Sequence, residues 1–129
     1  SAARRPRPKL SAIFWMFRRS LRASFNFIRN RSGSGSVVVL DYIVEQVIKN
    51  KFHGLYGAWV TTAGVLGVGE PYVSGWTPPQ AGAFVKKHRL VLVEDVGDRE
   101  LTARHLIGSD GKPDGRVQNW LRMLEAKVP

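Results

Sequence analysis

RNRSGSGSVVVLDY, residues Arg29 to Tyr42, joins a basic segment to an apolar one through a run of serines and glycines. Such a run is typical of a flexible linker, of a phosphate-binding loop, or of the connection from a helix into a buried strand. A dinucleotide-binding loop needs its glycines after a strand and at the start of a helix, whereas Gly33 and Gly35 precede the apolar run. We therefore predict a helix that ends with Gly33 in the left-handed conformation, followed by a strand over Ser36–Tyr42.

The rest of the chain alternates between strand and helix patterns. The β-branched run Ser36–Tyr42 predicts a strand buried on both faces, as in parallel α/β sheets. A short helix is expected next, and Thr77 followed by two prolines is a helix start. Trp120–Val128 is compatible with a strand or a helix on propensity alone. The other expected elements are helices over residues 43–50, 80–89 and 98–107, the last capped by Asp98, and a strand over Leu90–Val96.

Net charge is concentrated at one end of this 129-residue, single-domain chain. Residues 1–31 contain nine of the 20 arginines and lysines and none of the ten acidic residues. Such an arm favours phosphate or anionic lipid, and therefore RNA or a membrane surface, as its partner. The residues expected to bind that anionic partner are Arg4, Arg5, Arg7, Lys9, Arg18, Arg19 and Arg22.

The arm divides into a tail and a helix. Residues 1–10 have the proline- and arginine-rich composition of a disordered tail. Residues 11–31 predict a basic amphipathic helix with Ser11 as its N-cap. Such a helix packs on the sheet of its own domain, or lies on a membrane or in RNA. Its apolar stripe is Phe14, Phe17, Leu21, Phe25 and Ile28.

Several classes of site are not expected. The chain has no cysteine, and its three histidines lack the spacing of a helical metal pair, so we expect no metal site. The longest weakly polar run, residues 55–69, is too short for a membrane span, and no secretory signal pattern is present. The arginine-rich start is similar to the remainder of an organellar presequence, so we expect an intracellular protein, in mitochondria or another organelle.

Asp41 and Tyr42 are the most interesting polar pair, because they end the most hydrophobic strand. In open α/β sheets, ligands bind at the carboxyl ends of strands. The alternative is that Asp41 caps the following helix and Tyr42 packs in the core.

Three segments in order resemble leucine carboxyl methyltransferase-like proteins, which are class I S-adenosylmethionine-dependent methyltransferases. They are FNFIRNRSGSGSVVVLDYI (residues 25–43), GEPYVSGWTP (residues 69–78) and RLVLVEDVGDRELTARHL (residues 89–106). The resemblance covers roughly residues 23–128, with Leu40 in place of a phenylalanine and His105 in place of a tyrosine.

The resemblance implies an α/β fold: a partial Rossmann-like half-domain over residues 32–129 of about three strands and flanking helices. Residues 121–128 would be its terminal antiparallel strand, inserted between the last two neighbours of the sheet. The substrate side of the cleft would then be bordered by Asp41, Tyr42, Glu70 and Trp76. The family's cofactor-binding loop and acidic ribose ligand have no counterpart here. The strand at residues 37–41 would therefore have an exposed edge, a site for other protein chains.

Two functions follow from this resemblance. The first is a non-catalytic methyltransferase-like subunit of a larger ribonucleoprotein or membrane complex, anchored by the basic arm. The alternative is the substrate-side half of a split O-methyltransferase with a carboxyl or hydroxyl acceptor. On either hypothesis the chain alone binds no cofactor, and S-adenosylmethionine would bind only with a complementing partner.

Overall fold

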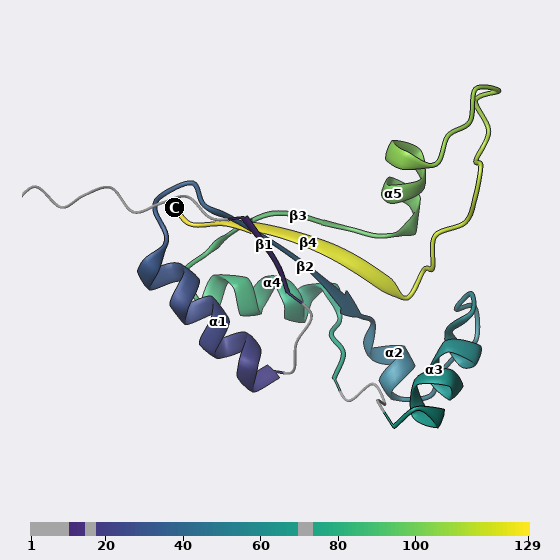
Figure 1. The fold of residues 1–129 in the computed structure, drawn as a ribbon, viewed down its shortest axis with the longest axis horizontal. Coiled ribbons are helices and arrows are strands. Elements are labelled where there is room, and N and C mark those ends of the chain that lie inside the picture. The colour runs from purple at the N-terminus through teal and green to yellow at the C-terminus, as the bar shows by residue number, and fades with distance from the viewer. Residues whose placement is uncertain (1–10, 15–17, 70–73) are drawn as a thin grey trace, which may run out of the picture.

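A mixed four-stranded sheet forms the centre of the protein (Figure 1). The computed structural model describes residues 11–14, 18–69 and 74–129. The strand order is β1-β2-β4-β3, with β1 parallel to β2 and with β4 antiparallel to both of its neighbours. The strands are β1 (Ser11–Phe14), β2 (Val37–Ile43), β3 (Val91–Val96) and β4 (Leu121–Lys127).

Five helices occur among the described residues, and two of them cover one face of the sheet. In Figure 1, α1 and α4 lie below the strands, whereas α5 lies above them. None of the helices in the described part of the chain is both long and apolar enough to cross a membrane. The helices are α1 (Arg18–Arg31), α2 (Glu45–Ile48), α3 (Ala58–Gly67), α4 (Pro78–Lys87) and α5 (Asp98–His105).

The main core lies between the sheet and the helices α1 and α4. Alternate residues of β2 point into it, so that Val38 and Leu40 are buried while Val37 and Val39 are only partly buried. The prediction of a strand buried on both faces is therefore wrong, because helices α1 and α4 cover only one face. Buried residues of this core include Leu21, Phe25 and Ile28 of α1, Val38, Leu40 and Tyr42 of β2, Ala81 and Val85 of α4, and Leu124 and Ala126 of β4.

The N-terminal segment differs from the predicted helix over residues 11–31. Residues Ser11–Phe14 form β1, and the helix begins only at Arg18. β1 pairs with β2 from Val37 to Leu40, so the predicted exposed edge at residues 37–41 is also wrong. Pairing satisfies the backbone groups that an open edge would leave free. Of the predicted stripe, Leu21, Phe25 and Ile28 of α1 pack on the domain's own sheet, as one of the two interpretations predicted, whereas Phe17 lies outside the described residues.

Helix ends follow local rules, with two corrections. Thr77 caps α4, since its Oγ1 accepts from the Gln80 amide at 3.4 Å and Gln80 Oε1 accepts from the Thr77 amide at 3.0 Å. The turn after α1 has its positive φ at Gly35 (80°) rather than at Gly33, because Gly33 begins a turn closed by the Ser36 amide. Asp98 is the first residue of α5 and not its cap.

Candidate functional site

Tyr42, Asp95 and Arg122 form a polar cluster where β2, β3 and β4 run side by side. Tyr42 Oη donates to Asp95 Oδ2 at 2.5 Å, and Arg122 Nε donates to Asp95 Oδ1 at 2.8 Å. Arg122 Nη2 also donates to the Asp95 carbonyl at 3.1 Å. Tyr42 and Arg122 are register partners on neighbouring strands, so the sheet itself brings the three side chains together. The cluster ties three strands together at the carboxyl end of β2.

Burial and charge shift the pKa values of Tyr42 and Arg122. The pKa of Tyr42 is raised, first by burial and then by its hydrogen bond to the negative charge of Asp95. Burial alone would lower the pKa of Arg122, but the hydrogen bond and charge of Asp95 outweigh it and raise that pKa. Tyr42 is therefore a neutral donor near pH 7, and it is not a general base.

Trp76 lies against this cluster because the segment before α4 runs beside the end of β2. The Trp76 amide donates to the Ile43 carbonyl at 3.0 Å, and the Tyr42 and Trp76 ring centroids are 5.9 Å apart. Gly75 makes this approach possible, because a Cβ there would lie 2.8 Å from the Ile43 carbonyl oxygen. The structure thus brings together two of the four residues predicted for a substrate cleft, Tyr42 and Trp76.

Asp41 lies on the opposite face of the sheet from Tyr42. Adjacent residues of a strand point to opposite faces, and Tyr42 is on the helix-covered face. Burial raises the pKa of Asp41, although its backbone hydrogen bond acts in the other direction. Asp41 does not cap α2 either, because Val44 is the N-cap residue of that helix.

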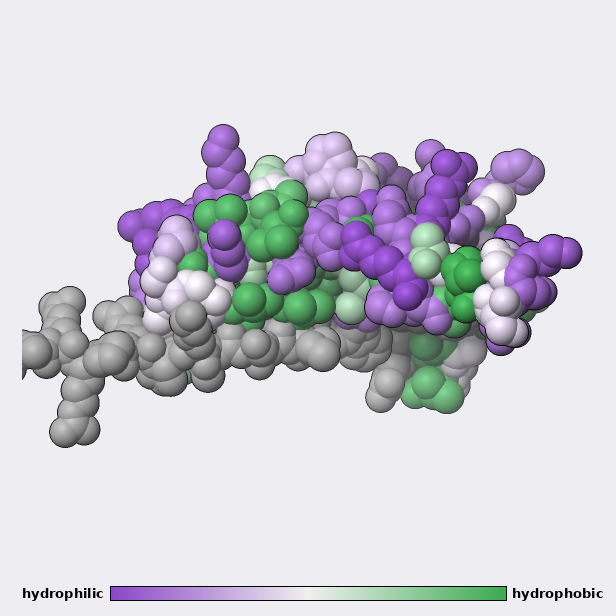
Figure 2. Space-filling model, turned by 90° about the horizontal axis from the view of Figure 1, so that it is seen from above, coloured by the Kyte–Doolittle hydropathy of each residue, from purple (hydrophilic) through white to green (hydrophobic). Residues whose placement is uncertain are grey.

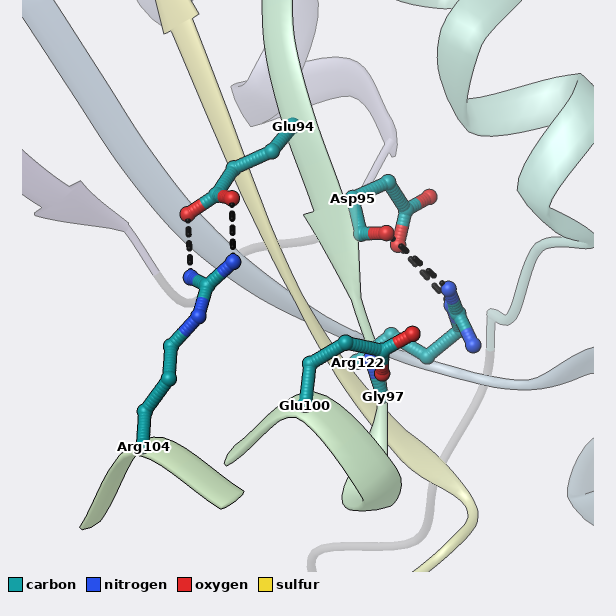
Figure 3. A network of polar contacts seen from close by, with 6 residues as sticks. All are labelled: Glu94, Asp95, Gly97, Glu100, Arg104 and Arg122. Atoms are coloured by element: carbon teal, nitrogen blue, oxygen red, sulfur yellow. Dashed lines mark hydrogen bonds and ion pairs between the residues drawn. The ribbon is translucent and has the colours of Figure 1, made fainter. Parts of the chain in front are cut away.

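A second set of charged contacts lies on the face that carries Asp41. Glu94 and Asp95 project to opposite sides of β3 (Figure 3), and Arg104 of α5 makes two hydrogen bonds of 2.8 and 2.9 Å to Glu94. Arg104 lowers the pKa of Glu94 mainly through these hydrogen bonds. Glu100 Oε2 accepts from the Gly97 amide at 2.9 Å and so fixes the start of α5. These contacts attach α5 to the edge strand.

The remaining predicted residues lie outside the cluster. Glu70 and the tail residues Arg4, Arg5, Arg7 and Lys9 are outside the residues that the structure describes. Arg18, Arg19 and Arg22 belong to α1, and Arg22 is exposed.

Sequence reasoning missed Asp95 and Arg122 as partners of Tyr42. Asp95 was visible as a polar residue near a strand end, but propensity alone did not assign the segment of Arg122, and the resemblance that implied a strand there did not identify Arg122 as a partner of Tyr42. In the described part of the chain, no three histidine or carboxylate side chains lie close enough together to hold a metal ion. The arrangement can orient the phenolic hydroxyl of Tyr42 and the guanidinium of Arg122 beside the indole ring of Trp76.

The comparisons with known proteins add no family: no family model, no curated protein and no solved structure matches the chain.

Proposed function

We propose that the protein is a non-catalytic, methyltransferase-like subunit of a larger assembly. The order of β2, β4 and β3 supports this proposal, because an antiparallel strand lies between two mutually parallel strands. The methyltransferase-like sheet expected from the sequence ends in the same arrangement. The polar cluster at Tyr42 supports a non-catalytic role, since its carboxylate is already engaged by Arg122 and by the phenol.

The observation that carries the proposal is the sheet face opposite α1 and α4. Hydrophobic side chains gather on this face among charged ones (Figure 2). Of the described helices, only α5 lies on this side, and it contacts the sheet through Arg104. Apolar side chains on a sheet face that no helix packs against favour this face as an interaction surface. By register, its apolar residues include Val37 and Val39 of β2, Met123 of β4 and Val91 of β3, of which Val91 is 42% exposed.

The basic arm supplies the second part of the proposal. Arg22 is exposed on α1, and the excess positive charge of the chain lies within residues 1–31. Phosphate groups of RNA or of lipid are the complementary surface. We propose that this arm anchors the subunit in its assembly.

Association and cofactor binding test the proposal together. The tagged full chain is isolated at low salt from the cells that produce it, and its companions are identified and counted. We expect companions in fixed stoichiometry and no retention of radiolabelled S-adenosylmethionine in equilibrium dialysis with the chain alone. A chain that is isolated alone, or one that retains the cofactor by itself, would contradict the proposal.

A matched pair of variants places the association on the sheet face. Val39→Glu puts a charge on the uncovered face, whereas Ala83→Glu puts the same charge on an exposed position of α4, outside the basic arm. We expect Val39→Glu to lose the companions and to keep its helical circular dichroism, and Ala83→Glu to keep both. Loss of companions in both variants would contradict the assignment to this face.

The split-enzyme alternative is favoured by one contact, that of Tyr42 with Trp76 at the carboxyl end of β2. A companion with a strand followed by a glycine-rich loop, together with cofactor retention by the mixture, would support this alternative.

A further inference from the structure

Helix α3 turns its largest apolar side chains toward solvent. Its sequence, AWVTTAGVLG, contains no charged residue. The side toward the protein carries Ala58, Thr61, Thr62 and Val65, of which Ala58 is fully buried. A surface helix in water normally shows the opposite arrangement, with apolar residues inside. The side toward solvent carries Trp59, Val60 and Leu66, each 65% exposed, and Val68 just after the helix is 73% exposed.

Two threonines lie on the side of α3 that faces the protein. Thr61 Oγ1 donates to the Gly57 carbonyl at 2.9 Å, so its hydroxyl is used within the helix. Thr62 Oγ1 is buried and has no hydrogen-bond partner among the described residues. An unpartnered buried hydroxyl destabilises a protein, and it gives the inward side no advantage over the outward side.

Space around α3 is open. A Cβ added to Gly57, Gly64, Gly67 or Gly69 would meet no atom within 4 Å. The exposed apolar side chains of Trp59, Val60, Leu66 and Val68 together mark a contact surface.

Basic side chains precede α3 in the chain. Residues 46–69 contain two lysines and one histidine but no acidic residue, and Glu45 and Glu70 flank this range. Lys49 pairs with Glu45 at 3.3 Å, while Lys51 is exposed. The Arg116 guanidinium lies 3.8 Å from the ring centroid of Tyr56, immediately before the helix. Cations beside an aromatic and apolar helix complement the anionic headgroup layer of a bilayer.

We propose that the outward side of α3 inserts into the interface of an anionic membrane, with Lys51 and Arg116 at the level of the lipid phosphates. Trp59 and Leu66 would lie at the boundary between headgroups and acyl chains, where indole rings are favoured. RNA would engage the cations but would leave these apolar side chains in water. The proposal is independent of the methyltransferase-like fold, because it rests on the α3 surface alone.

Vesicle binding tests the proposal with the full chain. Partitioning is measured by sedimentation with vesicles of phosphatidylcholine alone and of phosphatidylcholine with 30% phosphatidylserine. The double variant Trp59→Ser/Leu66→Ser removes the apolar contact, and Val93→Ser/Ile107→Ser removes two other exposed apolar residues outside the basic arm as the matched control. The basic arm is present in all of these proteins, so any difference between them belongs to the substituted surface.

We expect the wild type to bind the mixed vesicles, and the Trp59/Leu66 variant to partition about 100-fold more weakly, from the apolar area that two large side chains bury. The control should stay within about twofold, and Lys51→Ser should weaken binding to the mixed vesicles about fivefold. Brominated lipid should quench tryptophan fluorescence in the wild type and much less in Trp59→Phe.

Two results would overturn the proposal. The first is equal partitioning of the wild type and the Trp59/Leu66 variant, which would assign any binding to the arm. The second is self-association of the wild type in lipid-free buffer, lost in that variant, which would make a second copy of the chain the occupant of this surface.

Discussion

Helices α1 and α3 show opposite relations between side-chain polarity and burial. In α1, Phe25 is fully buried and the arginine Arg22 is exposed, whereas in α3 the large Trp59 is exposed and threonines face inward. Charged residues mark the outer side of α1 and leave only one side for the sheet. Helix α3 has no charged residue, so its orientation is set by contacts at its ends, where Trp120 Nε1 donates to the Tyr56 carbonyl at 2.8 Å. Apolar content alone thus does not predict which side of a helix is buried.

The same type of substitution in both helices gives the sharpest test of this contrast. Phe25→Ala removes a ring packed 5.0 Å from the Phe84 centroid, and should lower the free energy of unfolding by about 3–5 kcal/mol. Trp59→Ala removes a larger ring but should change the free energy of unfolding by less than about 0.5 kcal/mol, because the ring is exposed. Urea unfolding followed by circular dichroism measures both. Similar losses in the two variants would show that Trp59 is packed within the chain.

A second prediction concerns the polar cluster that ties the strands beneath Trp76. Asp95→Asn removes the charge that Arg122 and Tyr42 share, and should lower the free energy of unfolding by about 2 kcal/mol. The control is Glu94→Gln on the other face of the same strand, whose ion pair with Arg104 is more exposed. That pair is exposed to solvent, so Glu94→Gln should have a much smaller effect on stability than Asp95→Asn. Equal effects from both substitutions in thermal or urea unfolding would show that burial does not strengthen the Asp95 cluster.

Local signals in the sequence predicted several elements correctly. The β-branched run before Tyr42 is a strand, and Thr77 with its prolines starts a helix, because both features depend on neighbouring residues only. The segment at Ser11–Phe14 was assigned to a helix, since Phe14 continues the stripe of α1 at a step of three. Its pairing with β2 is a contact between distant segments that periodicity does not report.

The sequence alone predicted only part of the candidate site. Asp41 and Tyr42 were grouped as one site, although adjacent residues in a strand necessarily point to opposite faces. The alternation of side chains along a strand is enough to place Asp41 and Tyr42 on different faces of the sheet. Asp95 and Arg122 become partners of Tyr42 only through the order β2-β4-β3, which requires the strand assignment of residues 121–127. The resemblance implied that strand, and its position between two neighbours is confirmed.

A third prediction tests whether the inward threonines of α3 are a structural defect. Thr62→Val replaces a buried hydroxyl that has no partner with a methyl group of similar size, and should raise the free energy of unfolding by about 1 kcal/mol. Thr61→Val is the matched control, because the Thr61 hydroxyl donates to the Gly57 carbonyl. That variant should be unchanged or slightly less stable in urea unfolding. A loss of stability in Thr62→Val would reveal that its hydroxyl has a partner.

The smallest expected effect compares the two faces of β2 and depends on pH. Burial raises the pKa of Asp41 above its usual value of 3.8, so the folded state binds its proton more tightly than the unfolded state does. Stability therefore falls as the pH rises from that value through the raised pKa, and the cost persists at neutral pH. Asp41→Asn removes this cost and should stabilise the protein at pH 7 by less than about 1 kcal/mol, since solvent screens a partly exposed group. The gain should vanish near pH 3.5 in urea unfolding, and Asp114→Asn in an exposed loop should show no gain at either pH. A gain for Asp41→Asn that persists at low pH would mean that the substitution acts through packing and not through the charge.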